Sequence, residues 1–145
     1  MYSRLAPRSS FAKPLAFSEA YRHVGVETGV AAASAHQLVR MLFDGFVDAV
    51  ARAKGALQSG QIQTKGEAIG RAVRIIDEGL KCSLDLRGGG TLAADMGQLY
   101  GYITLRLTQA NLRSDEAALD ECLRLIQPLR EAWASIAPQV ESRNA

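Results

Sequence analysis

The hydrophobic positions of this chain recur every three or four residues from about residue 34 onward, which is the spacing of amphipathic α-helices. This pattern predicts four helices, over residues 34–59, 64–84, 91–111 and 114–137. The short connections between them make successive helices antiparallel. The predicted fold class is therefore all-α, an antiparallel up-and-down four-helix bundle with a loose N-terminal segment or a short extra helix.

The helix ends are predicted from their capping residues. Ser34 and Ser114 are expected as N-caps of the first and fourth helices, and Gly60 is expected to end the first. Thr64 and Glu67 have the spacing of a capping box that would start the second helix.

Three regions differ in composition. Residues 1–33 contain Pro7 and Pro14 and are predicted to be a flexible N-terminal arm or cap. Residues 34–137 are predicted to form the helical bundle domain, in which Pro128 is expected to kink the last helix. Residues 138–145, which follow the break at Pro138, are predicted to be a disordered tail.

The second helix carries two apolar stripes where a bundle helix needs only one. The first is the expected core face and comprises Ile69, Val73, Ile76, Leu80 and Leu84. The other consists mostly of small residues: Ala68, Ala72, Ile75, Gly79 and Cys82. This second stripe is either the floor of a solvent-facing groove that admits a partner helix or a face covered by a third helix of the bundle, and the pattern leaves both open.

Charge and composition argue against several partners. The 145 residues carry a formal net charge of +2 without a cluster of Lys and Arg, so no nucleic-acid partner is expected. No apolar run reaches the roughly 18 residues of a membrane helix, so no membrane insertion is expected and a cytoplasmic location is predicted. Cys82 and Cys122 are interpreted as small buried apolar residues.

The chain also lacks the usual signatures of catalysis. It contains no Glu-x-x-His pair, and His23 and His36 are interpreted as isolated surface histidines. Gly88, Gly89 and Gly90 follow a helix rather than a strand, which is the wrong context for a phosphate-binding loop. The prediction is a protein that is not an enzyme, with no catalytic residue, no metal and no cofactor.

Several short motifs in order resemble the flagellar secretion chaperone FliS family, from about Ala20 to Trp133. They are Ala20-Tyr21 with Val26-Glu27-Thr28, Leu38 to Gly45, Lys65 to Ile69 with Ile75-Ile76, Ser83-Leu84-Asp85 with Gly88-Gly89, Leu99-Tyr100, Tyr102, Leu107, Ala110-Asn111, and Leu129 to Trp133. The resemblance implies a cytoplasmic chaperone that binds the disordered C-terminal segment of flagellin, prevents premature polymerisation and assists secretion. It also implies contact with the flagellar export apparatus and an N-terminal segment that covers part of the groove when flagellin is absent.

The expected flagellin groove combines the surplus apolar residues with flanking polar groups. It comprises Tyr21, Phe43, Val47, Ala68, Ala72, Ile75, Gly79, Tyr102, Leu105, Arg106 and Asn111. Tyr21 is either a core residue or the anchor of the arm, and Asn111 is either a left-handed helix cap or a hydrogen-bonding group for the client. An Ile75→Asp exchange is predicted to weaken flagellin binding and to leave thermal melting almost unchanged.

An alternative from another class is a structural oligomerisation module. In that case the same stripes would pair with a second copy of the chain to form a homodimer.

Overall fold

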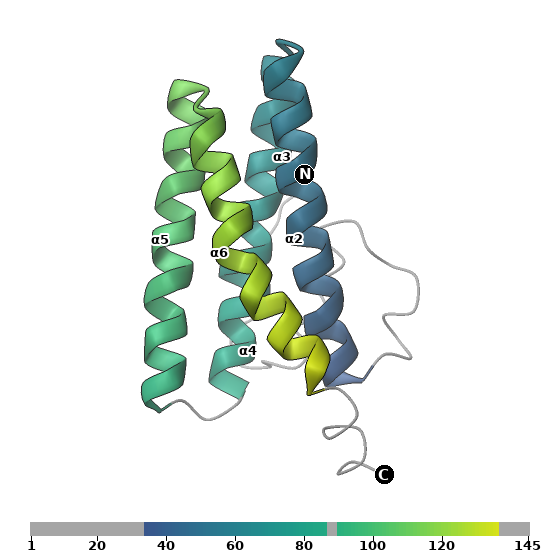
Figure 1. The fold of residues 1–145 in the computed structure, drawn as a ribbon, viewed down its shortest axis with the longest axis vertical. Coiled ribbons are helices and arrows are strands. Elements are labelled where there is room, and N and C mark those ends of the chain that lie inside the picture. The colour runs from purple at the N-terminus through teal and green to yellow at the C-terminus, as the bar shows by residue number, and fades with distance from the viewer. Residues whose placement is uncertain (1–33, 87–89, 137–145) are drawn as a thin grey trace, which may run out of the picture.

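The computed structural model describes residues 34–86 and 90–136. Its elements are α2 (Ala35–Gln58), α3 (Ile62–Arg74), η2 (Ile75–Leu80), α4 (Lys81–Leu86), α5 (Thr91–Arg113) and α6 (Glu116–Ser135). Because α3, η2 and α4 follow one another without a break, the described residues form four long rods that alternate in direction (Figure 1). The predicted antiparallel four-helix bundle is confirmed.

The first helix begins and ends as the sequence predicts. The Ser34 hydroxyl accepts a hydrogen bond from the Gln37 backbone N–H, and the Gln37 side chain accepts one from the Ser34 N–H, both at 3.1 Å. At the other end Gly60 adopts a left-handed φ of +73°, and the Gln61 N–H closes on the Ala56 carbonyl at 2.8 Å. The two ends of α2 are thus fixed by local chemistry.

The predicted boundaries of the next helices are wrong by a few residues. The second rod begins at Ile62 with Gln61 as N-cap, so Thr64 lies inside the first turn and forms no cap. The left-handed turn at Gly60 reverses the chain at once, and the helix therefore starts earlier.

The connection between the last two helices also differs from the prediction. Ser114, with φ +50°, is the left-handed C-cap of α5, so Asn111 does not have that role. Asp115 is the N-cap of α6, and its carboxylate accepts a hydrogen bond from the Ala118 N–H at 3.3 Å. Helix α6 continues through Pro128 to Ser135, whereas the predicted stop at Pro138 lies outside the described residues.

The core is one continuous cluster to which every rod contributes. Its largest fully buried side chains are Tyr100, Phe46, Leu42, Ile75, Ile76, Leu80, Ile103, Leu107, Leu119, Ile126 and Val50. Each such side chain stabilises the fold by roughly 1.5–3 kcal/mol through removal from water. Cys122 is buried as predicted, and burial raises the pKa of its thiol to about 12. Cys82 is only half-buried.

The π-helical turn η2 lets residues spaced four apart along the second rod all face the core. In an α-helix each four-residue step advances about 40° around the axis, so three steps from Ala72 would carry Leu84 about 120° away from the core. A π-helix bonds residue i to i+5 and turns less per residue, which removes much of this drift. Ile76 and Leu80 therefore stay fully buried, and Leu84 still packs against the core.

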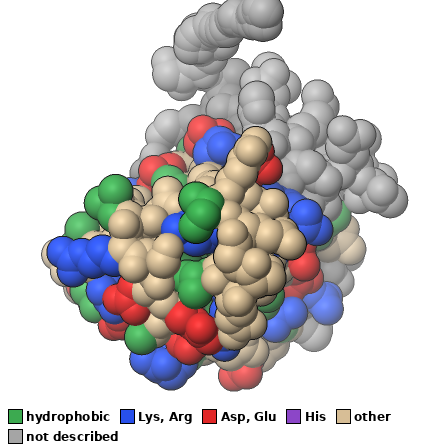
Figure 2. Space-filling model, turned by 90° about the horizontal axis from the view of Figure 1, so that it is seen from above, with side chains coloured by type: hydrophobic (Ala, Val, Ile, Leu, Met, Phe, Trp, Pro, Cys, Tyr) green, Lys and Arg blue, Asp and Glu red, His purple; other side chains and the backbone are tan. Residues whose placement is uncertain are grey.

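Ion pairs join α2 to α6 at two levels. Lys54 Nζ lies 2.7 Å from Asp120 Oδ1, and Arg130 Nε lies 2.8 Å from Asp44 Oδ1. These partly exposed pairs contribute little stability, and they lie where the two helices run side by side. Viewed from above the bundle, acidic and basic side chains are interspersed with hydrophobic ones (Figure 2). Within the described residues, no helix has both the length and the apolar character needed to cross a membrane.

Candidate partner-binding site

A pocket lies at the end of the bundle where α5 and α6 separate. Helix α6 begins beside α5 and crosses the bundle diagonally, so that it ends beside the start of α2 (Figure 1). The pocket has a volume of about 450 Å³ and is lined from α2, α4, α5 and α6. This volume is within the range of pockets that hold ligands or partner side chains.

The described lining of this pocket is apolar and uncharged. It consists of Val39, Phe43, Ser83, Leu84, Leu92, Ala93, Met96, Tyr100, Leu129, Ala132, Trp133 and Ile136. Burial raises the pKa of Tyr100, which keeps its hydroxyl neutral, and the Ser83 hydroxyl donates to the Leu80 carbonyl at 2.7 Å. The pocket therefore suits apolar side chains and would penalise a charged group.

One wall of the pocket is held by a contact between His36 and Trp133. The two rings stack with centroids 4.8 Å apart and planes 12° apart. Nε2 of His36 donates to the Trp133 carbonyl at 3.1 Å, and Nε1 of Trp133 donates to the His36 carbonyl at 3.0 Å. His36 is only 3% exposed, so its interpretation as a surface histidine is wrong. Helix α6 covers it, which the spacing along α2 could not show.

At the opposite end of the bundle, a buried lysine ties α3 to α5. Lys65 is 3% exposed, and its Nζ donates to the Asn111 carbonyl at 3.0 Å and to the Ser114 hydroxyl at 2.8 Å. A cation at the carbonyl end of a helix is favoured by the helix dipole. Sequence reasoning missed this role, although Lys65 lies four residues before Ile69 on the core face.

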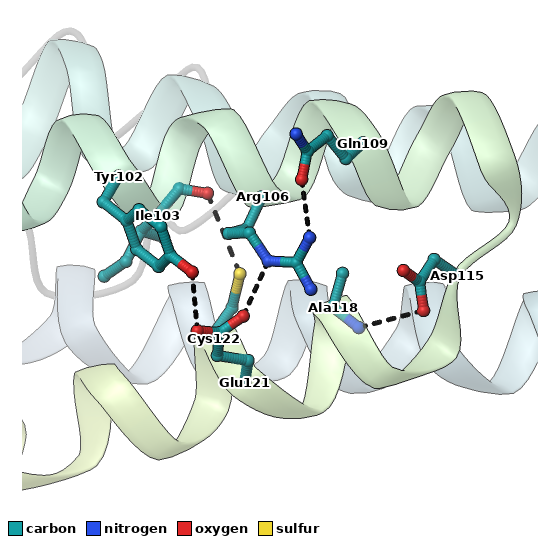
Figure 3. A network of polar contacts seen from close by, with 8 residues as sticks. All are labelled: Tyr102, Ile103, Arg106, Gln109, Asp115, Ala118, Glu121 and Cys122. Carbon is teal, nitrogen blue, oxygen red and sulfur yellow. Dashed lines mark hydrogen bonds and ion pairs between the residues drawn. The ribbon is translucent and has the colours of Figure 1, made fainter.

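A polar network closes the seam between α5 and α6 (Figure 3). Glu121 accepts hydrogen bonds from the Tyr102 hydroxyl at 2.7 Å and from Arg106 Nε at 2.6 Å. The hydrogen bond from Tyr102 lowers the pKa of Glu121 most, and the bond from Arg106 lowers it further. The hydrogen bond between Tyr102 and Glu121 also raises the pKa of Tyr102. Arg106 belongs to the expected flagellin groove, and in the structure its partner is a carboxylate of its own chain.

The network predicts a pH dependence of stability. The pKa of Glu121 in the folded protein lies below its ordinary value of 4.5. As the pH falls, the Glu121 carboxylate is therefore protonated more readily in the unfolded chain than in the folded one. The contribution of Glu121 to stability is therefore present above about pH 4.5 and is lost as the pH falls through the folded pKa. We expect Glu121→Gln to lower the melting temperature at pH 7 and to have a shrinking effect as the pH approaches 3.

Thermal melts of the wild type and the variant between pH 7 and pH 3 test this expectation. Glu78→Gln, on the exposed side of η2, is the control and should show no comparable trend. A Glu121→Gln effect that stays constant down to pH 3 would contradict the role given to the carboxylate.

The second stripe of the second rod does not face solvent. Ala68 is 4% exposed, Ala72 and Ile75 are fully buried, and Gly79 is buried as well. A Cβ atom at Gly79 would lie 2.9 Å from both methyl groups of Leu42, which shows how closely η2 and α2 approach. Of the two alternatives that the sequence pattern left open for this stripe, the structure shows the covered face, because α2 packs against it at Ile75 and Gly79.

The two residues of the first helix in the expected groove, Phe43 and Val47, are also mostly covered. Phe43 is 2% exposed and contributes to the pocket, Val50 is fully buried, and Val47 is half-buried against the core. Tyr102 and Leu105 remain exposed, as does Asn111, whereas Tyr21 lies outside the described residues. Contact of any of these residues with flagellin remains a prediction.

Helical spacing alone could not single out the residues that line the pocket. Leu84, Leu92, Met96 and Trp133 occupy apolar positions at helical spacing, and a pocket wall has the same pattern as a core face. A pocket wall differs from a core face here only because α5 and α6 separate at this end of the bundle. That separation depends on the direction in which α6 crosses the bundle. No local signal in the sequence carries that direction.

The described residues form an all-helical bundle with an apolar, uncharged pocket. A sequence model of the family described as "Flagellar protein FliS" matches residues 17–140. Over 121 residues the chain is 46% identical to the flagellar secretion chaperone FliS of Salmonella typhimurium, covering 83% of this chain and 90% of the relative. The chaperone of the same name from Escherichia coli is 41% identical over 80% of this chain and 85% of its own length. That from Vibrio cholerae is 35% identical over 88% and 93%, respectively.

These matches cover most of the chain and most of each relative. The chain therefore belongs to the FliS family of flagellar secretion chaperones.

Proposed function

We propose that this chain is a cytoplasmic export chaperone that binds the disordered C-terminal segment of flagellin, keeps it from polymerising and delivers it to the flagellar export apparatus. Family membership supports the export role, and the apolar pocket between α2, α4, α5 and α6 is the observation that carries the binding step. An unfolded client segment gains free energy when its apolar side chains leave water for such a pocket.

The chemistry of the pocket fits a chaperone better than an enzyme. Its described lining offers no ionised side chain, and the buried hydroxyl of Ser83 in α4 already donates to the Leu80 carbonyl of η2. Binding without charged contacts depends on buried apolar area and discriminates little between client sequences. Such binding suits a client segment that must later be released.

Leu92 offers a sharp test of the pocket. It is 72% exposed, lies in the first turn of α5 and lines the pocket. A carboxylate in the first turn is favoured by the helix dipole, so Leu92→Asp should leave stability unchanged or slightly higher. Because the variant places a charge at an apolar wall, we expect its affinity for the C-terminal segment of flagellin to fall by about tenfold or more.

Ala117→Asp is the matched control, because Ala117 is also exposed in the first turn of a helix, α6, but lies away from the pocket. Titration of a labelled flagellin C-terminal segment into the wild type and both variants provides the measurement. Equal affinities for all three chains would remove the pocket from the mechanism. A wild type that does not bind the segment would overturn the proposed function.

A further inference from the structure

Helix α6 is divided in two by Pro128, which lies inside the helix and is exposed to solvent. Proline has no N–H group, so the carbonyl of Arg124 receives no helical hydrogen bond from residue 128, and the proline ring crowds the same carbonyl. Both effects weaken a helix locally, and proline is a common cause of sharp bends in helices. Pro128 is therefore the position at which α6 bends most easily.

The two halves of α6 differ in burial. Every buried residue of α6 precedes the proline. These residues are Ala118, Leu119, Cys122 and Ile126. Residues 129–136, which we call the α6 wall segment, are half-buried or exposed. Segments with few buried side chains open locally at a lower free-energy cost than the core does, so the α6 wall segment opens more easily than the first half of the helix.

The pocket draws its α6 side from the second half of the helix. The lining residues that α6 and its C-cap supply all belong to the α6 wall segment. They are Leu129, Ala132, Trp133 and Ile136. Leu92 and Met96 of α5 line the same pocket. Movement of the α6 wall segment about Pro128 therefore changes the width of the pocket and leaves the buried first half of α6 in place.

The contacts along α6 follow the same division. Before the proline, the Glu121 network closes the seam between α6 and α5 (Figure 3). After it, Arg130 Nε donates to Asp44 of α2 at 2.8 Å. The stacked rings of Trp133 and His36 form a second contact with α2. These two contacts, which we call the latch, hold the α6 wall segment to α2.

We propose that the α6 wall segment is a hinged wall of the pocket, which bends about Pro128 to admit an apolar segment and is held closed by the latch. Movable walls of this kind set the rates at which a ligand enters and leaves its site. The inference rests on the proposed function for the identity of the entering segment, whereas the hinge and the latch belong to the bundle itself.

Pro128→Ala tests the hinge in the full chain without any client. Alanine restores the missing backbone donor, removes the crowding and has the highest helix propensity. In the wild type, we expect amide hydrogen exchange measured by NMR to be at least about tenfold faster over residues 129–135 than over residues 118–126. We expect Pro128→Ala to slow exchange over residues 129–135 by about tenfold.

Gly55→Ala is the control for a general gain in stability. Gly55 is exposed within α2, and a Cβ atom there would have no heavy atom within 4 Å. This exchange also raises helix propensity, but it should leave exchange over residues 129–135 unchanged because those amides open locally. Equal wild-type rates over the two halves of α6 would show that the helix opens as one unit, which overturns the inference. An unchanged rate over residues 129–135 in Pro128→Ala overturns it as well.

Asp44→Asn tests the latch from the other side. The exchange removes the ion pair with Arg130, and Asp44 is not among the described pocket residues. Because a partly exposed ion pair is weak, we expect exchange over residues 129–135 to become only about threefold faster. Asp48→Asn removes the same charge from an exposed position one turn further along α2 and should exchange like the wild type. Equal effects of the two variants would remove the ion pair from the latch and overturn this part of the proposal.

Binding rates show whether the hinge controls the pocket. For a labelled flagellin C-terminal segment, we expect Pro128→Ala to lower both the association and the dissociation rate constants and Asp44→Asn to raise both. Wild-type rate constants in both variants would overturn the inference. If the wild type does not bind the segment, the proposed function is wrong, and the exchange rates alone decide whether the α6 wall segment is hinged.

Discussion

Replacing Ile75 by Asp is expected to unfold the bundle. The side chain has no solvent exposure and packs where α2 passes closest, since a Cβ atom at Gly45 would lie 3.5 Å from Ile75 Cδ1. A carboxylate at this position would be buried without a partner or would have to push the helices apart, at a cost above about 4 kcal/mol. A domain of this size has only about 5–15 kcal/mol of stability in total. This reverses the expectation from the sequence that the exchange would spare the fold.

Circular dichroism melts give the measurement, and Ile62→Asp gives the control. Ile62 is 64% exposed at the first residue of α3, where a carboxylate meets the positive end of the helix dipole. We expect the control to melt with the wild type and Ile75→Asp to lose most of its helical signal or to melt far below it. If Ile75→Asp melts at the same temperature as the wild type, Ile75 is not a core residue and faces a solvent-accessible groove.

Separating His36 from Trp133 is expected to have the second largest effect. Their contact joins the first turn of α2 to the last turn of α6 through two hydrogen bonds and a ring stack. Truncation of His36 to Ala removes the stack and the bond donated by its ring, and leaves the Trp133 carbonyl without that donor. We expect a loss of about 2–4 kcal/mol.

A double-mutant cycle isolates this contact from the other roles of Trp133. We expect His36→Ala, Trp133→Ala and the double variant, unfolded in urea, to give a coupling energy of about 1–3 kcal/mol. Because Trp133 lines the pocket, Trp133→Ala should also weaken binding of the flagellin segment. Additive losses of stability would show that the two rings do not support one another.

Much of the fold follows from local chemistry. Ser34 and Gly60 fix the ends of α2 through side-chain and backbone hydrogen bonds that depend on neighbouring residues only. The predicted start at Thr64 fails because the backbone turn at Gly60 sets the first residue of α3. The π-helical turn was not predicted; Gly79 and Leu80 within it are buried against other rods.

Less of the candidate site follows from the sequence. The expected groove took apolar residues from several rods, and the structure treats them differently: Ile75 and Gly79 are buried against α2, whereas Leu105 on α5 is exposed. Helical periodicity gives the angle of each side chain around its own axis. It does not give the side on which a neighbouring helix will lie.

The sequence by itself determined the class of fold, the order of the rods and the family, because helical spacing, caps and motifs are properties of neighbouring residues. The tertiary structure alone decided which apolar stripes are consumed by packing and which remain for a partner. That choice depends on the path of α6, which leaves α5 at one end and so opens the pocket beside His36 and Trp133. The path is set by packing between residues far apart in the chain, such as the stacked rings of His36 and Trp133, and no local pattern encodes such contacts.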